Sequence, residues 1–321
     1  MKELSKTSGV VRQVVGEEAA SQRIDNFLIR TCKGVPKSHL YRILRSGEVR
    51  VNSRRVAPTY RLQAGDEVRI PPLQVAAQET LSPPASRRFE VVFEDEHLLV
   101  LNKPAALAVH GGSGVSFGVI EQLRQQRPDE RGLELAHRLD RETSGLLIVA
   151  KSRRALAGMH EMLREGRIEK RYLALVRGAW REARKDVRLS LHKYVTSEGE
   201  RRVAVRSDGQ AAHSVVRLVS RWHNFSLLEV QLMTGRTHQI RVHLSHLGFP
   251  LCGDDKYGDF ELNKSLQKIG LKRMFLHAST LSLHHPITGR QLELTAPLPK
   301  DLQRFLGLLD EHEQRTDVAA V

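Results

Sequence analysis

The chain has 321 residues, a length that suggests two domains. It carries 51 Lys and Arg against 37 Asp and Glu, a formal charge of +14, which indicates a polyanionic partner, either nucleic acid or an anionic membrane. A membrane is the weaker option, because no apolar run approaches the roughly 20 residues of a spanning helix and the start of the chain lacks an apolar signal core. Cys32 and Cys252 are the only cysteines and lie far apart, so a reducing cytoplasm is the expected location.

The region that follows the N-terminus is strongly basic. Between Arg30 and Arg61 the sequence has nine basic residues and a single acid. Residues 49–51 and 68–70 alternate apolar and basic side chains, as short half-buried strands do. A plain solvated face has the same composition, so charge alone leaves a phosphate-binding surface and a solvated surface both open.

Two short helices are predicted within this basic region. Apolar residues at helical spacing indicate a first helix after an N-cap at Ser21. A second helix is predicted to begin at the N-cap Ser38 and to end at Gly47. Arg42 and Arg45 then lie on the face of the second helix opposite its apolar residues.

Proline pairs mark the end of the basic module. Pro71-Pro72 and Pro83-Pro84 bracket a stretch of small residues without a clear period. This composition is typical of a semi-extended tether. We therefore divide the chain into a basic module (14–75), a linker (76–87), a larger domain (88–309) and a polar tail (310–321).

The larger domain alternates strand-like and helical segments. Strands are predicted at residues 89–93, 98–101, 133–135, 146–150, 171–176, 228–232, 276–283 and 291–294. Residues 152–165 have apolar side chains on one helical face, and a second helix follows Thr234-Gly235. Hairpins mixed with helices predict an α+β fold with a mixed, largely antiparallel sheet and flanking helices.

The stretch from His137 to Gly145, HRLDRETSG, is the most informative one. It places Asp140 between Arg138 and Arg141 in a polar loop that closes on Thr-Ser-Gly. A loop at the end of a strand is where a scaffold presents a reactive side chain, and the two arginines are expected to keep Asp140 ionised. On spacing alone, a surface loop with an Arg–Asp pair fits as well. The string resembles the HRLDxxTSG signature of the RluA family of pseudouridine synthases.

Two further strings resemble motifs of the same family. Residues 170–174, KRYLA, are similar to its second motif, and residues 235–243, GRTHQIRVH, are similar to its third. The resemblance implies that Tyr172 lines the pocket of the target base and that Arg241 forms a bidentate pair with Asp140. It covers nearly the whole chain and implies a curved sheet whose central cleft holds the active site, preceded by an S4-like RNA-binding domain.

The same resemblance assigns further residues to RNA. Arg138 is expected to fill the space that a flipped base leaves, and Arg236 and His238 are candidates for phosphate contacts. His137 is grouped with them as a substrate contact. In the basic module, the candidates for phosphate contact are Lys37, Arg42, Arg45, Arg50, Arg54 and Arg55.

The implied reaction constrains the cofactors. Conversion of uridine to pseudouridine breaks the N1–C1′ bond, rotates the uracil and rejoins it through C5. This is redox-neutral and needs no group donor, so no cofactor is expected. No metal is expected either, since His238, His243 and His246 do not converge on one ion by their spacing. Whether Asp140 attacks the sugar or the base, or stabilises a cationic or glycal-like species, stays open at this point.

The expected partner follows from resemblance within the family. Residues 33–38 and 111–114 are most similar to members that act on 23S ribosomal RNA, so 23S RNA or a large-subunit assembly intermediate is expected, with the protein as a monomer. Two rival classes are a non-catalytic S4-type RNA-binding or ribosome-assembly protein and an N-glycosidase that releases uracil. A pure binder has no use for a carboxylate such as Asp140 facing an anionic ligand.

Overall fold

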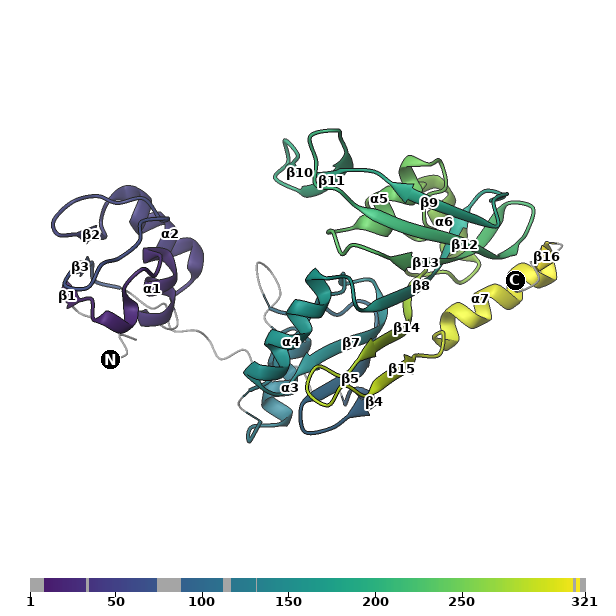
Figure 1. Ribbon diagram of the computed structural model, residues 1–321. Helices are drawn as coiled ribbons and strands as arrows, with labels where there is room; N and C mark the ends of the chain where they lie inside the picture. Colours follow the sequence, from purple (N-terminus) through teal and green to yellow (C-terminus); the bar gives the residue numbers. More distant parts are fainter. Residues whose placement is uncertain are drawn as a thin grey trace. The chain divides into compact units, whose positions relative to one another are not determined.

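The structure is a computed structural model that describes residues 9–32, 35–73, 88–111, 117–130, 132–313 and 316–317 (Figure 1). The chain divides into two compact units, residues 1–82 and 83–321. The predicted linker, residues 76–87, lies outside the described residues. None of the helices in the ranges given above is long and apolar enough to cross a membrane.

The N-terminal unit packs two helices against a small antiparallel sheet. Its elements are β1 (Val11–Val14), the 3-10 helix η1 (Glu17–Ala19), α1 (Ile24–Thr31), α2 (Lys37–Ser46), β2 (Arg50–Val51) and β3 (Glu67–Ile70). The strands lie in the order β1-β3-β2. Phe27 of α1, Ile43 of α2 and Val68 of β3 are almost completely buried in one core, so the basic residues between such positions are left at the surface.

The starts of both helices differ from the predicted caps. α1 begins at Ile24, and Ser21, which has a left-handed φ of 66°, lies before it. α2 begins directly after Pro36, so Ser38 lies inside the first turn. Both predictions were wrong because neither helix has a side-chain cap, and the fixed φ of proline starts the second one. The predicted end of α2 is confirmed, with Gly47 in the left-handed region at φ 76°.

The C-terminal unit is built on an eleven-stranded sheet. Its strands are β4 (Glu90–Glu94), β5 (Leu98–Lys103), β6 (Glu134–Leu135), β7 (Ser144–Ala150), β8 (Glu169–Arg177), β9 (Arg184–Arg188), β12 (His213–Arg221), β13 (Phe225–Leu232), β14 (Leu276–His284), β15 (Gln291–Thr295) and β16 (Thr316–Asp317). They lie in the order β16-β12-β13-β8-β14-β7-β5-β4, with β15 beside β14, β6 beside β7 and β9 beside β12. The predicted α+β fold with a mixed, mainly antiparallel sheet is confirmed.

Five helices and a separate ribbon complete this unit among the residues described. The helices are α3 (Val119–Gln126), α4 (Arg153–Arg164), α5 (Gln239–His246), α6 (Phe260–Lys268) and α7 (Lys300–His312). The ribbon consists of β10 (Leu191–Val195) and β11 (Arg201–Val205), which pair with each other. α4 begins and ends as predicted, since Ser152 accepts the backbone N–H of Ala155 and Glu165 is the C-cap. α7 continues past the expected start of a polar tail at residue 310.

The helices cover both faces of the sheet, because successive residues of a strand point to opposite sides. In β7, Val149 belongs to the core that contains residues of α3 and α5, whereas Ile148 belongs to the core that contains residues of α4. In β8, Val176 joins the first of these cores, and Leu175 packs with residues of α6 and α7. The sheet is therefore buried on both sides near its centre.

The two parts of the large sheet meet at a parallel pairing. β14 and β7 share only two residue pairs, His277 with Ser144 and Ala278 with Gly145. Gly145 has a φ of 109°, and a Cβ atom there would overlap the backbone of Ala278. Ser144 and Gly145 therefore begin a strand, and only the residues before them form the loop that contains Asp140.

We expect Gly145→Ala to destabilise the C-terminal unit. Alanine at this position meets both the strain of a positive φ and overlap with Ala278, together about 2–4 kcal/mol of unfolding free energy. Gly289→Ala is the matched control, since Gly289 has a φ of 72° but nothing within 4 Å of its Cβ position, and should lose about 1 kcal/mol. Urea unfolding followed by fluorescence of Trp180 and Trp222, both in this unit, measures the difference. Equal losses would contradict the close packing of β7 on β14.

Candidate active site

Asp140 lies in the connection between β6 and β7, residues 136–143, which we call the Asp140 loop. Its neighbours Leu139 and Thr143 are buried. The backbone N–H of Thr143 donates to the carbonyl oxygen of Asp140 at 3.2 Å, which closes a turn. The Asp140 side chain is 19% exposed. Buried neighbours and a closed turn thus fix the backbone that presents this carboxylate.

Lys103 attaches the Asp140 loop to the end of β5. It is fully buried, and its Nζ donates to the carbonyl oxygens of Pro104 at 2.8 Å, Leu107 at 2.9 Å and Arg141 at 3.2 Å. Burial lowers the pKa of Lys103 to about 7, while the three carbonyl groups favour its charged form. The backbone next to Asp140 is therefore held by a side chain that arrives from another strand.

His137 makes a second attachment within the same loop. Its Nε2 accepts the backbone N–H of Ile148 in β7 at 3.0 Å. Burial, together with the charge of Lys170, lowers the pKa of His137 to about 4, so the ring is neutral at pH 7. The ring also lines the cavity beside Asp140. His137 was predicted as a substrate contact, and the structure gives it a role in holding the loop as well.

The two arginines beside Asp140 in the sequence are directed elsewhere. Arg141 pairs with Glu142, with 3.4 Å between Nε and Oε1. Arg138 is exposed at the edge of the cavity. An ion-pair partner of Asp140 is instead Arg241, a residue 101 positions away in the sequence.

Arg241 of α5 contacts Asp140, but not in the predicted geometry. Its Nη1 donates one hydrogen bond to Asp140 Oδ2 at 3.2 Å. The bidentate partner is Asp254, whose two oxygens accept from Nε and Nη2 at 2.7 Å each. Burial opposes its charge, yet the carboxylates raise the pKa of Arg241 above its usual range. The predicted bidentate pair between Arg241 and Asp140 was wrong, because the fork of the guanidinium is already occupied by Asp254.

Tyr172 lies on β8 and lines the same cavity as Asp140. Its side chain is 6% exposed and joins the core shared with α5. Burial, and then the charge of Asp140, raises the pKa of its hydroxyl well above the usual range. Tyr172 therefore presents a neutral phenol to the cavity at any physiological pH.

The cavity beside Asp140 has a volume of about 600 Å³, which is within the range of small-molecule sites. It is lined by the Asp140 loop, the end of α4, the start of β8 and residues 232–241. Among the described residues that line it, Asp140 is the only acid. The cations that line it are Arg138, Arg164, Lys170, Arg236 and Arg241. This distribution of charge suits an anionic ligand whose reacting part approaches a single carboxylate.

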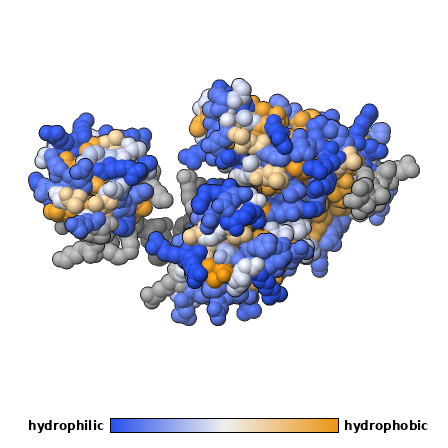
Figure 2. Space-filling model, in the orientation of Figure 1, coloured by the Kyte–Doolittle hydropathy of each residue, from blue (hydrophilic) through white to orange (hydrophobic). Residues whose placement is uncertain are grey.

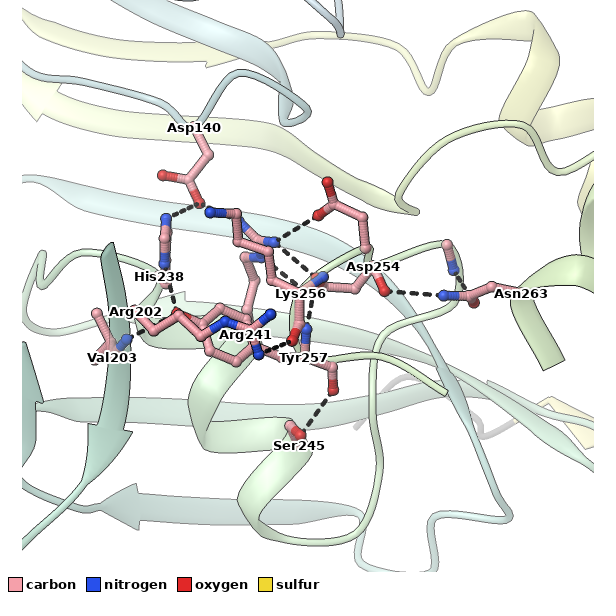
Figure 3. A network of polar contacts seen from close by, with 12 residues as sticks. Asp140, Arg202, Val203, His238, Arg241, Ser245, Asp254, Lys256, Tyr257 and Asn263 are labelled. Carbon is pink, nitrogen blue, oxygen red and sulfur yellow. Dashed lines mark hydrogen bonds and ion pairs between the residues drawn. The ribbon is translucent and has the colours of Figure 1, made fainter. Parts of the chain in front are cut away.

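His238 connects Asp140 to the β10–β11 ribbon (Figure 3). Its Nε2 lies 3.8 Å from Asp140 Oδ2, and its Nδ1 lies 2.8 Å from the Tyr257 hydroxyl. That hydroxyl accepts the backbone N–H of Val203 in β11 at 2.9 Å, so its own proton is available to His238. Burial lowers the pKa of His238, which favours the neutral ring. His238 thus faces Asp140 and Tyr257, and its contact with phosphate stays a prediction.

The histidines of this region do not gather around a metal. His243 is fully buried, with Nδ1 3.1 Å from Ser214 Oγ and Nε2 3.2 Å from the carbonyl oxygen of Leu189. His238 faces Asp140 and Tyr257 instead. Over the part of the chain that the structure describes, no group of three His, Cys, Asp or Glu side chains is arranged to hold a metal ion.

The RNA-contact candidates of the N-terminal unit lie at its surface. The exposed ones are Arg42, Arg45, Arg50, Arg54 and Arg55. The side chain of Lys37 lies outside the described part of the structure. The one acid of the basic region, Glu48, has its Oε1 3.6 Å from Nη1 of Arg42. Figure 2 shows that the visible face of this unit is largely hydrophilic, as a surface for a polyanion requires.

Several residues around the site were not predicted. α4 contributes His160 and Arg164 to the cavity, and the only signal for this helix was its apolar period. Lys170 lines the cavity two residues before Tyr172, so both point to the same side of β8. Asp254 was not predicted as a site residue, because it lies outside the three strings that resemble the family. The glycine-rich string at residues 111–114 lies mostly outside the described residues.

Comparison with known proteins gives consistent matches over the chain. The model of the RNA pseudouridylate synthase domain matches residues 97–246, and the S4 domain model matches residues 22–68. Ribosomal large subunit pseudouridine synthase C of Pasteurella multocida is 50% identical over 305 residues, 93% of this chain and 94% of that protein. The protein of the same name from Escherichia coli K12 is 49% identical over 313 residues, 95% and 98% of the two chains. The solved structure of human RNA pseudouridylate synthase domain containing 1 covers 75% of this chain and 94% of its own, with a TM-score of 0.60 and 27% identity.

The fold and these matches define the class of protein. The chain belongs to the RluA family of RNA pseudouridine synthases, which are isomerases, and its N-terminal unit contains an S4 domain. Within this family, the chain is similar over almost its full length to the type C synthases of the large ribosomal subunit.

The half-buried His137 gives a pH dependence with a definite sign. Its pKa is lowered from 6.5 to about 4 in the folded protein, so the unfolded chain takes up a proton first as the pH falls. We expect the free energy of unfolding to decrease between about pH 6.5 and pH 4, with roughly 1–3 kcal/mol due to this residue. His137→Gln keeps an acceptor for the Ile148 amide but does not titrate. Urea titrations at several pH values should show a flatter acid limb for this variant, and identical slopes in both proteins would contradict the assignment.

Proposed function

We propose that the protein isomerises specific uridines of 23S ribosomal RNA to pseudouridine without a cofactor. The observation that carries the proposal is the cavity, in which one carboxylate, Asp140, lies beside Tyr172 among several cations. Cations in the cavity suit the phosphates of a nucleic acid, and a carboxylate among them suits chemistry at its sugar or base. Two relatives, both named ribosomal large subunit pseudouridine synthase C, support large-subunit RNA as the substrate.

The residues of the cavity have complementary roles in this reaction. Asp140 supplies negative charge beside the scissile N1–C1′ bond, as a nucleophile or as the partner of a cationic species. Arg241 orients it through the hydrogen bond of 3.2 Å. Tyr172 provides a surface on which uracil stacks, and its neutral hydroxyl can exchange a proton during formation of the C5–C1′ bond.

The target nucleotide reaches this cavity by leaving its base stack. The exposed side chain of Arg138 lies at the cavity and fills the vacated space in the RNA with its planar guanidinium. Arg164 of α4 and Arg236 of the segment before α5 line the cavity from separate elements. We assign them to the phosphates on either side of the flipped nucleotide.

The S4 domain supplies further affinity for RNA in this proposal. Its exposed arginines contact phosphates, and their contribution depends on salt because counterions are released. We place the reaction in the cytoplasm, with the protein acting as a monomer on 23S RNA or on an assembly intermediate of the large subunit. In this proposal, residues 14–75 supply affinity for RNA, and residues 88–309 carry out the isomerisation.

Asp140→Asn is the direct test of the proposed reaction. The variant keeps the shape of the side chain but removes its charge, so we expect pseudouridine formation to fall by at least about 10⁴-fold while RNA binding persists. Tritium release from C5-labelled 23S RNA and nuclease mapping of pseudouridine give the readout.

The same assay distinguishes the rival classes. An N-glycosidase would release free uracil, and a non-catalytic RNA-binding protein would leave the wild-type reaction without product. Multiple turnover by Asp140→Asn would contradict the assignment of Asp140.

The basic surface of the S4 domain gives a prediction about salt. We expect combined replacement of Arg42, Arg50 and Arg54 by glutamine to weaken binding of a 23S transcript and to lower the log–log salt slope by about two to three units. Pseudouridine formation should survive at high protein concentration, because the cavity is unchanged. The matched control replaces the exposed Lys264, Lys268 and Lys272 of the C-terminal unit. The same salt slope in both triple variants would identify the arginines as an ordinary solvated face.

A further inference from the structure

We infer that Asp254 positions Arg241 for the reaction. Arg241 in turn orients Asp140. This inference rests on the proposed function and goes beyond it. Asp254 does not line the cavity, so it acts through Arg241 rather than on the RNA.

Arg241 makes more hydrogen bonds, and shorter ones, to Asp254 than to Asp140. Asp254 accepts from both Nε and Nη2 at 2.7 Å, whereas Asp140 accepts from Nη1 alone at 3.2 Å. Asp255 adds a contact of 3.3 Å to Nη2, but its side chain is 71% exposed. A bidentate pair fixes the plane of a guanidinium as well as its distance. The plane of Arg241, and with it the direction of Nη1, is therefore set by Asp254.

Asp254 is itself more firmly held than Asp140. Its Oδ1 also accepts the backbone N–H groups of Lys256 at 2.8 Å and Tyr257 at 3.0 Å. Asn263 of α6 donates to its carbonyl oxygen at 2.9 Å (Figure 3). The Asp254 side chain is 1% exposed, against 19% for Asp140. A rigid loop thus determines where the guanidinium lies before any substrate arrives.

This arrangement contacts Asp140 without enclosing it. Two charge-assisted hydrogen bonds to Asp254 use Nε and Nη2 of Arg241, and Nη1 makes the hydrogen bond to Asp140. That bond uses Oδ2, and within the described residues Oδ1 of Asp140 has no hydrogen bond or ion pair. A carboxylate held at one oxygen keeps the other for the reacting nucleotide.

Asp254→Asn tests the inference in the full-length protein. The amide group brings N–H donors against the N–H donors of Arg241, so the guanidinium loses its fixed plane. Displacement of about 1 Å in a reacting arrangement costs about 100-fold in rate. We expect kcat for pseudouridine formation to fall about 100-fold, with Kd for a 23S transcript within about twofold of the wild type.

The control is a structural aspartate five residues further on. Asp259 caps α6 through the backbone N–H of Leu262 and pairs with Arg177. Asn is also a good N-cap, so Asp259→Asn should leave kcat unchanged. Asp254→Asn with kcat within threefold of the wild type would overturn the inference. Loss of RNA binding and a lowered Tm in parallel with kcat would also overturn it, because Asp254 would then be structural only.

A second measurement covers the case in which Asp254→Asn does not fold. The Nε–H resonance of Arg241 reports its bond to Asp254 directly, and Asp140→Asn leaves that bond in place. We expect this resonance to keep its position and its slow exchange in Asp140→Asn. A shift to the position of a solvated arginine would mean that Asp140 sets the orientation, which overturns the inference. Failure of the proposed function is seen separately, as wild-type protein that forms no pseudouridine in the same assay.

Discussion

The site depends on the burial of one guanidinium group. Arg241 is 4% exposed, and an uncompensated cation at such a depth costs several kcal/mol. Asp254 and Asp140 provide the compensation from two loops that are far apart in the sequence. α5, the loop after it and the Asp140 loop must therefore come together for any of them to be stable in place. The three side chains that meet the electrostatic requirement of the fold are also those to which we assign a role in the reaction.

The supporting contacts keep this charge cluster in one arrangement. Lys103 holds the Asp140 loop from β5, and His137 holds it from β7. On the opposite side, Tyr257 joins His238 to the β10–β11 ribbon through Val203. Neutral histidines and a neutral phenol surround the charged groups, which limits the number of buried charges. The cavity can then present one carboxylate to RNA while its remaining lining stays cationic or neutral.

The sequence predicts the parts of this arrangement that depend on local pattern. The helix α4 follows from its apolar period, and Asp140 is identified by a string that resembles a family signature. Asp254 could not be identified as the bidentate partner, because pairing across a loop depends on three-dimensional distance and not on spacing. Arg138 and Arg141 were predicted as the charged partners of Asp140 for the same reason. Adjacency in the chain suggested an ion pair, but Arg141 pairs with Glu142, and the ion pairs of Asp140 are with His238 and Arg241.

The parallel junction between β14 and β7 has a consequence for the order of folding. It joins Ser144 to His277, residues that are 133 positions apart, through only two residue pairs. Closing so long a loop costs conformational entropy before the strand contacts offset it. Such pairings therefore form late. Antiparallel hairpins such as β4–β5 and β12–β13, one on each side of this junction, close sooner. Asp140 belongs to one side of this junction, and Tyr172 and Arg241 belong to the other. During synthesis, these three residues of the candidate site therefore come together only after β14 has left the ribosome, whereas the S4 domain is complete much earlier.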